Sequence, residues 1–399
     1  MGYDELQQNL DAFDTLLSSM SLMAARITRT LCVFMKIQPS QSDFHHWRNP
    51  RRGTSNPERM DNPFWQWCVQ TRESAYAANE KFNGSSSMGS GPCWCFQRMG
   101  QAHITLPDGR DVFIGGEHED HYDPDFYIYN DVVIVDGEQV NIYGYPESDF
   151  PPTDFHTATL VEKAILIIGN LGYPDDRRIG ETQVLRLDLD SFEIFLQPTT
   201  GANPGWLHDH SSKFNETNNS IRVTGGKRYT ERISENFHDF ELCLNSFEWR
   251  VAIERNWKSW ILEREDGDAN ELWQIRQESW NRKLGLSTKD HLAETLEGIP
   301  DEIIAEMTPN VTDRQIEEIE NLYRSPFGGS LAIEDDENYG RYRLSIDEVI
   351  VRFDESMYGV TVTVEGELPD SKTDSLLSQL KQRLESIEQT EYKTTTIDT

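Results

Sequence analysis

Basic residues are scarce in this sequence of 399 residues, because 37 lysines and arginines stand against 69 aspartates and glutamates, giving a formal net charge of -32. Sequence-independent binding to DNA or RNA requires lysine and arginine to displace counterions from phosphate, so the balance argues against a nucleic-acid partner. It argues equally against docking on anionic membranes. A basic protein partner or a cation suits the charge better. Since the acidic residues are spread along the whole chain, we favour solubility over a specific partner as the reason for the negative net charge.

Long apolar runs are also missing. Leu16–Ile37 is interrupted by Arg26 and Arg29, and no segment approaches the about 20 consecutive apolar residues of a membrane span. Asp4 and Glu5 stand where a secretory signal would carry positive charge. The five cysteines show no regular spacing, so they predict reduced thiols and no disulfide framework. Together these absences predict a cytoplasmic protein.

Catalytic signatures are absent from the sequence as well. It contains no nucleophile elbow, phosphate-binding loop, dinucleotide fingerprint or zinc-binding His-Glu helix. Cys93-Trp94-Cys95 lacks the second cysteine pair that a structural zinc site needs. These absences favour a non-enzymatic binding protein without a cofactor. The alternative is an enzyme or a sensor of small ligands.

The sequence does contain three copies of one repeat between His103 and Trp257. Each copy begins near a histidine (His103, His156 or His210) and continues into an apolar run that ends in a glycine pair or its remnant. The structural glycines of these pairs are Gly115, Gly116, Gly169, Gly225 and Gly226. The pairs lie about 54 to 56 residues apart, which is within the range of propeller blades.

The repeats predict a mainly β fold. Short runs with period-two alternation across residues 100–257 favour four-stranded antiparallel blades. The glycine pairs and the histidine before the first strand resemble the kelch repeat of β-propellers, although the first copy lacks the late tryptophan of that pattern. The stretch from Phe64 to Trp257 is also similar to a group of bacterial kelch-like proteins of unassigned activity. The resemblance implies a kelch-like β-propeller that binds proteins or ligands, while some propellers of this kind are isomerases, cyclases or oxidases.

Three blades are too few for a closed ring, because propellers close with about four to eight blades. Unclosed end blades would expose strand edges and invite aggregation. We expect degenerate blades within residues 58–100 and after Trp257 to complete the ring. The alternative is an open stack of sheets covered by helices.

Strand direction predicts which loops meet. In a four-stranded antiparallel blade, the start of the first strand and the end of the second lie at the same face of the propeller. The repeat histidines, the glycine pairs and the loops after them should therefore gather at one face that can hold a charged ligand. The candidate residues are His103, His156, His210, His208, Trp206, Tyr173, Arg177, Arg178 and Arg228. For the three repeat histidines we favour a structural role, in which they hydrogen-bond the backbone.

The loop after the first glycine pair combines carboxylates with imidazoles, and such groups can bind a divalent metal. The candidate ligands are Glu117, His118, Asp120, His121, Asp123 and Asp125. Their spacing lacks the regularity and the glycine of a calcium-binding loop. A metal is therefore the weaker interpretation of this loop.

The flanking regions predict further modules. Apolar residues from Leu6 to Phe34 follow one another at spacings of four and three, which predicts a heptad helix within residues 1–37. We expect the apolar seam of this helix to pack on the rest of the same chain, on a second copy of the chain in a homo-oligomer, or on a different protein. A linker at 38–62 is followed by the propeller region at 63–260, which includes a helix through Phe82. After it we expect a helical segment at 261–328. The chain then continues with a β-β-α module at 329–390, which a strand at Leu331–Ile333 extends, and with a frayed tail at 391–399.

Overall fold

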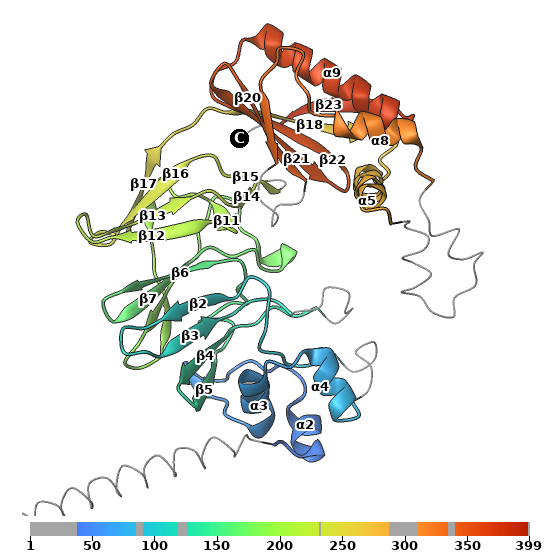
Figure 1. Cartoon of the computed structure of the whole chain (residues 1–399). Helices are drawn as coiled ribbons and strands as arrows, with labels where there is room; N and C mark the ends of the chain where they lie inside the picture. The colour runs from blue at the N-terminus through green and yellow to red at the C-terminus, as the bar shows by residue number, and fades with distance from the viewer. Residues whose placement is uncertain are drawn as a thin grey trace, which may run out of the picture. The chain divides into compact units, whose positions relative to one another are not determined.

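The computed structural model describes residues 38–84, 91–118, 126–230, 233–286, 310–333 and 340–397. The predicted heptad helix at residues 1–37 lies outside the described residues. The structure is mainly β, with 36% strand and 21% helix arranged as several antiparallel sheets and helices. The chain divides into two compact units, Met1–Ile253 and Glu254–Thr399, which are described separately below (Figure 1).

Each copy of the predicted repeat forms one antiparallel sheet in the first unit, and four strands follow one another in chain order in each sheet (Figure 1). The first sheet contains β2 (Ala102–Thr105), β3 (Asp111–Ile114), β4 (Asp131–Asp136) and β5 (Gln139–Gly144), with the short β1 (Glu58–Arg59) beside β5. The second contains β6 (Thr157–Val161), β7 (Ala164–Ile168), β8 (Val184–Asp188) and β9 (Ile194–Leu196). The third contains β12 (Ser211–Asn215), β13 (Ser220–Thr224), β16 (Asp239–Cys243) and β17 (Glu248–Ile253), with β10 (Thr200–Gly201) parallel to β17. A smaller sheet consists of β11 (Trp206–His208), β14 (Lys227–Tyr229) and β15 (Ile233–Glu235).

The second sheet buries both of its faces. Ile165 and Ile167 of β7 share one hydrophobic cluster with residues of the first sheet, such as Ile114. Leu166 and Ile168 share another cluster with residues of the third sheet. Because side chains alternate between the two faces of a strand, a strand buried on both sides must be apolar throughout, and β7 is. The three sheets therefore pack face to face in chain order.

Helices and aromatic side chains cover the other face of the first sheet. They are α2 (Gln41–Trp47), α3 (Pro63–Thr71) and α4 (Ala75–Lys81), and the segment after residue 91 packs with them. Trp65 of α3 stacks on Trp94 with ring centroids 4.9 Å apart. The expected degenerate blade in residues 58–100 is therefore wrong, since Asn62 caps a helix whose apolar residues recur at helical spacing. The predicted linker at 38–62 contains α2, whose Phe44 is fully buried.

A buried ion pair fastens this aromatic layer to the first sheet. The Arg98 side chain is fully buried, and its Nη2 lies 2.9 Å from Oδ2 of Asp131 at the start of β4. Trp94 Nε1 donates to the same oxygen at 3.1 Å, and the Arg98 guanidinium lies 3.4 Å from the ring centroid of Tyr129. A buried charge pair needs such additional partners, because each ion has lost its water.

The second unit is one six-stranded sheet with helices packed against one face (Figure 1). In sheet order its strands are β19 (Ser330–Ile333), β20 (Arg341–Ile346), β21 (Val349–Ser356), β22 (Gly359–Glu365), β18 (Lys258–Arg264) and β23 (Tyr392–Ile397). Its helices are α5 (Leu272–Lys283), α8 (Asp313–Glu320) and α9 (Asp370–Glu388). Thr312 is the N-cap of α8, and the predicted strand at Leu331–Ile333 is confirmed.

Within the predicted β-β-α module, β20 and β21 form a hairpin, because Asp347 and Glu348 make a two-residue turn with φ of 49° and 67°. Two expectations for this unit are wrong. The tail expected to be frayed contains β23, which pairs with β18 over its whole length. The described residues after Trp257 form no separate blade, since β18 belongs to this sheet.

Candidate ligand-binding face

The entry segments of the three repeats run side by side in the first unit. The Phe155 N–H donates to the Gly100 carbonyl at 2.9 Å, and the Asp209 N–H donates to the Phe155 carbonyl at 2.7 Å. All three residues have left-handed backbones, with φ of 61°, 47° and 57°. Corresponding backbone positions of successive repeats are therefore hydrogen-bonded to each other, and the loops beside them share one rim.

Strand register shows which residues of the repeats correspond. Ala102, Thr157 and Ser211 each begin a first strand opposite the last residue of the second strand. The residues just before them are Gln101, His156 and His210, so His103 is not the counterpart of the other two histidines. His103 is half-exposed on β2, where its Nε2 lies 2.9 Å from Asp111 Oδ1 and its ring stacks on Phe113. The structure brings His156 and His210 to the rim and places His103 elsewhere.

In the first two glycine pairs, the first glycine lets the next repeat approach. A Cβ at Gly115 would lie 2.2 Å from the Thr153 carbonyl oxygen, and one at Gly169 would lie 2.3 Å from that of Leu207. Cε1 of His210 would lie only 2.6 Å from the same Gly169 Cβ. All five predicted structural glycines have positive φ, namely Gly115, Gly116, Gly169, Gly225 and Gly226.

Three histidines at the rim are buried and have incomplete hydrogen bonding. Burial lowers the pKa of His156 and His210 to about 3 each, and that of His208 to about 4. All three are therefore neutral at pH 7. His210 Nε2 lies 2.9 Å from Thr157 Oγ1, but His210 Nδ1, His208 Nε2 and both ring nitrogens of His156 have no partner within the described ranges. Buried polar atoms without a partner are uncommon in folded proteins and call for water or a ligand.

Aromatic and cationic side chains from two loops interlock next to these histidines. Trp206 Nε1 and Arg177 Nε both donate to the Leu171 carbonyl at 3.0 Å. The Arg177 guanidinium lies 5.6 Å from the ring centroid of Tyr229. Tyr229 in turn stands opposite Trp206 in the β11–β14 pairing. Tyr173, from the same loop as Arg177, accepts a hydrogen bond from the Ile128 N–H at 2.9 Å.

The side chains of β14 alternate between its two faces. Lys227 stands opposite His208 and shares a face with Tyr229, whereas Arg228 stands opposite Leu207 and points to the other face. Burial lowers the pKa of Arg228, and its Nε has no partner among the described residues. Lys227 was not predicted as a site residue, because no spacing distinguishes it from other surface lysines. We call the residues Tyr173, Arg177, Arg178, Trp206, His208, Lys227 and Tyr229 the loop face.

The cations of the loop face lack carboxylate partners. Within the described ranges no carboxylate lies within 4.0 Å of Arg177, Arg178 or Lys227, although Glu235 stands opposite Lys227 in register. The Arg178 guanidinium instead donates to the Asp175 carbonyl at 3.0 Å. Because the chain has an excess of acidic residues, cations left without ion pairs mark a place where an anionic group can bind.

A pair of carboxyl groups lies beside the loop face. Asp154 is fully buried, and its Oδ1 accepts a hydrogen bond from the Gly172 N–H at 2.7 Å. Burial and the Asp154 charge raise the pKa of Glu117 to about 7, and burial also raises the pKa of Asp154. The charge of Arg177 acts in the opposite direction on Asp154. Asp154 was missed by sequence reasoning, since a single aspartate before the second repeat carries no pattern.

The predicted metal ligands are separated in the part that is described. His118 is fully buried, with Nε2 3.2 Å from the Cys93 carbonyl oxygen, so it belongs to the core. Asp120, His121, Asp123 and Asp125 lie outside the described residues. Among the described residues no group of three or more potential metal ligands is found.

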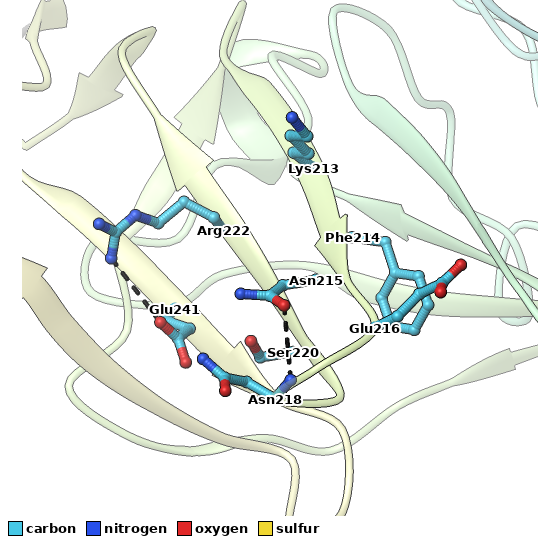
Figure 2. A pocket seen from close by; sticks show the side chains of 8 residues that line it. All are labelled: Lys213, Phe214, Asn215, Glu216, Asn218, Ser220, Arg222 and Glu241. Atoms are coloured by element: carbon cyan, nitrogen blue, oxygen red, sulfur yellow. Dashed lines mark hydrogen bonds and ion pairs between the residues drawn. The ribbon is translucent and has the colours of Figure 1, made fainter.

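A hollow of about 560 Å³ lies on the third sheet, apart from the loop-face residues (Figure 2). The Lys213, Arg222 and Glu241 positions adjoin across three strands, and Figure 2 shows the Arg222 guanidinium directed toward Glu241 at 3.7 Å. Arg250 binds the same carboxylate at 2.6 Å. Since opposite charges pair across strands here, the hollow is better explained as a polar sheet surface than as a ligand site.

Comparisons with known proteins add little to this geometry. No family model matches the chain, and no curated protein matches it. One solved structure, described as "Structure of YjhT", is similar over 43% of this chain and 55% of that chain, with 12% identity and a TM-score of 0.27. This likeness is too low to assign a fold or a function. Within the described ranges, no helix is long and apolar enough to cross a membrane.

Proposed function

We propose that the first unit is a kelch-like propeller segment that acts as a non-enzymatic binding module, and that its loop face binds a charged ligand or a protein partner. The propeller interpretation is supported by three four-stranded sheets that pack face to face in chain order. It is supported further by the proximity of the first strands, since Thr159 Oγ1 of β6 lies 2.7 Å from Ser212 Oγ of β12. In a propeller the corresponding strands of successive blades lie side by side in this way.

The observation that carries the binding proposal is the set of unsatisfied polar groups at one rim. His208 is 5% exposed, its Nε2 has no partner among the described residues, and the charges of Lys227 and Arg177 act on it. Trp206 and Tyr229 flank these groups. A ligand with hydrogen-bonding and anionic groups would satisfy the imidazole and the cations together, and the aromatic rings would provide contact area.

An enzyme is the second candidate, and the Glu117–Asp154 pair favours it. A carboxyl group with a pKa near 7 can exchange a proton at physiological pH, as a general acid or base must. Such a shift also arises in buried pairs that have only a structural role. The binding module therefore remains the first proposal.

The binding proposal is tested with the charge-reduced double variant Arg178→Ala/Lys227→Ala. Neither side chain makes an ion pair with the described residues, so the variant should fold normally. Immobilised wild type and variant are exposed to cytosolic extract, and the bound proteins and small molecules are quantified by mass spectrometry. We expect at least one species to be retained about tenfold less by the variant, which corresponds to a loss of about 1.4 kcal/mol in binding free energy.

The matched control is Lys163→Ala/Arg186→Ala, which removes two exposed cations from the second sheet. Lys163 pairs with Asp190 at 2.8 Å, and Arg186 lies 4.0 Å from Asp188, away from the loop face. This control should retain the same species as the wild type. Equal retention by all three proteins would contradict a binding role for the loop face.

A further inference from the structure

The second unit contains a cavity that the proposed function does not use. It has a volume of about 360 Å³ and lies where the beginning of α5 meets the ends of β20 and β21. Its lining includes Leu272, Trp273, Gln274, Arg276, Glu355 and Met357. The volume falls within the about 300–1,000 Å³ of small-molecule pockets, and mostly apolar walls with a few polar groups are typical of them.

Large apolar side chains stand exposed at the mouth of this cavity. Trp273 is 61% exposed and Met357 is 64% exposed, although both line the same space. Leu272, by contrast, is buried at 1% and closes the cavity toward the core. Exposed indole and thioether groups around a cavity are suited to holding a flat apolar ring between them.

An arginine with one free nitrogen lines the same cavity. Arg276 Nε lies 2.9 Å from both carboxylate oxygens of Glu355, and Tyr323 also donates to this carboxylate at 2.6 Å. These bonds fix the guanidinium and neutralise Glu355. Nη1 of Arg276 makes no hydrogen bond with the described part of the chain, so it can still donate to a ligand.

The first turn of α5 adds further donors. Glu271 occupies the N-cap position but its side chain makes no capping hydrogen bond. The backbone amides of Trp273 and Gln274 have no acceptor within the described ranges, and both residues line the cavity. Free amides and the positive end of the helix dipole favour an anionic group at this position.

We infer that this cavity binds a small aromatic anion. Its planar ring packs between Trp273 and Met357, and its carboxylate or sulfonate accepts hydrogen bonds from the two free amides of α5 and from Arg276 Nη1. The combination carries the assignment, because the apolar walls select a ring and the three unpaired donors select an anion. The exposed carboxylate of Glu271, at the N-cap of α5, opposes the ligand charge.

The inference is tested by titrating the full chain with 1-anilinonaphthalene-8-sulfonate, an aromatic sulfonate that becomes fluorescent in apolar sites. The test variant is Trp273→Ala and the matched control is Trp280→Ala, since Trp280 is also on α5 and 52% exposed but does not line the cavity. We expect one high-affinity site in the wild type. Trp273→Ala should weaken it about tenfold, as loss of a ring contact of about 1.4 kcal/mol implies, while Trp280→Ala should change it less than about twofold. Equal affinities in Trp273→Ala and wild type would overturn the assignment.

Two further measurements test the anionic part. Glu271→Gln should strengthen binding about two- to fivefold, because it removes a like charge beside the helix N-terminus. The uncharged probe N-phenyl-1-naphthylamine should bind at least about fivefold more weakly than the sulfonate, since it lacks a group for the free donors. Equal affinity for the two probes, or no gain in Glu271→Gln, would overturn an anion site.

Discussion

Glu117 and Asp154 are neighbouring carboxyl groups at the rim of the first unit, and ionisation of one disfavours ionisation of the other. Asp154 is fully buried and has one hydrogen bond from Gly172, while its Oδ2 has no donor among the described residues. A second negative charge beside it is unfavourable in this poorly hydrated site, so Glu117 holds its proton to a higher pH. At the scale of single residues, this pair makes the rim sensitive to pH near neutrality.

The Glu117→Gln variant tests this pair through stability. The pKa of Glu117 rises from 4.5 to about 7 on folding, so its stabilising contribution is complete below pH 4.5 and is lost as the pH rises through 7. Glutamine keeps the size and never ionises. We expect the difference in melting temperature, variant minus wild type, to increase as the pH rises from about 5 to about 8. Glu181→Gln, at an exposed position, should show no such trend, and parallel profiles for all three proteins would contradict the paired site.

The repeat pattern predicts residue types better than side-chain positions. The glycines were predictable, because the end of each second strand requires a left-handed backbone, and at Gly115 and Gly169 the next repeat also passes closely. His103 was not placed correctly, since a histidine two positions further along a strand looks equivalent in sequence while its side chain is on a different part of the sheet. Asp154 was missed because its importance comes from its interaction with Glu117 of the first repeat. Lys227 was missed because no spacing distinguishes it from other lysines.

At the scale of elements, β23 contributes more to the second unit than its polar sequence indicates. Its central residues are exposed, but Tyr392 at its start is fully buried and donates from its hydroxyl to Glu388 at 2.8 Å. The strand lies at the edge of the sheet, where it covers one side of β18. The C-terminal segment is therefore part of the core.

Tyr392→Ala should destabilise the second unit by about 3 kcal/mol, the lower end for removing a buried aromatic side chain. Thr394→Ala, on an exposed position of the same strand, should change the free energy of unfolding by no more than about 0.5 kcal/mol. Urea denaturation followed by circular dichroism measures both. If the two substitutions had equal effects, β23 would not be anchored through Tyr392.

Elements with an uninterrupted periodic pattern were predictable from the sequence. The helix of the predicted β-β-α module is α9, which buries the stripe of Leu377, Leu380, Leu384 and Ile387. Short aromatic segments were not predictable in the same way, because Phe64, Trp65 and Trp67 suit either a helix or a strand. There the cap at Asn62 favours the helix, and tertiary packing on the first sheet decides the outcome.

At the scale of the whole molecule, the two units have separate hydrophobic cores. One cluster contains only residues of the second unit, from Leu262 to Tyr392. The other three contain only residues of the first unit. The division falls after Ile253, a few residues before the expected end of the propeller region at residue 260. The difference arises because β18 continues the repeat-like pattern of short strands but pairs with β22 and β23.

Separate cores predict separate unfolding transitions, because a domain with its own core unfolds cooperatively as a unit. Differential scanning calorimetry of the full chain should therefore show two transitions. Tyr392→Ala should lower the melting temperature of one transition by about 10 °C, since a loss of about 3 kcal/mol has an effect of this size in a domain of about 150 residues. The melting temperature of the other transition should not change. Raising the pH from about 5 to 8 should shift only the other transition through Glu117, and Glu117→Gln should remove that part of the shift. A single transition moved by both substitutions would show that the two units unfold together.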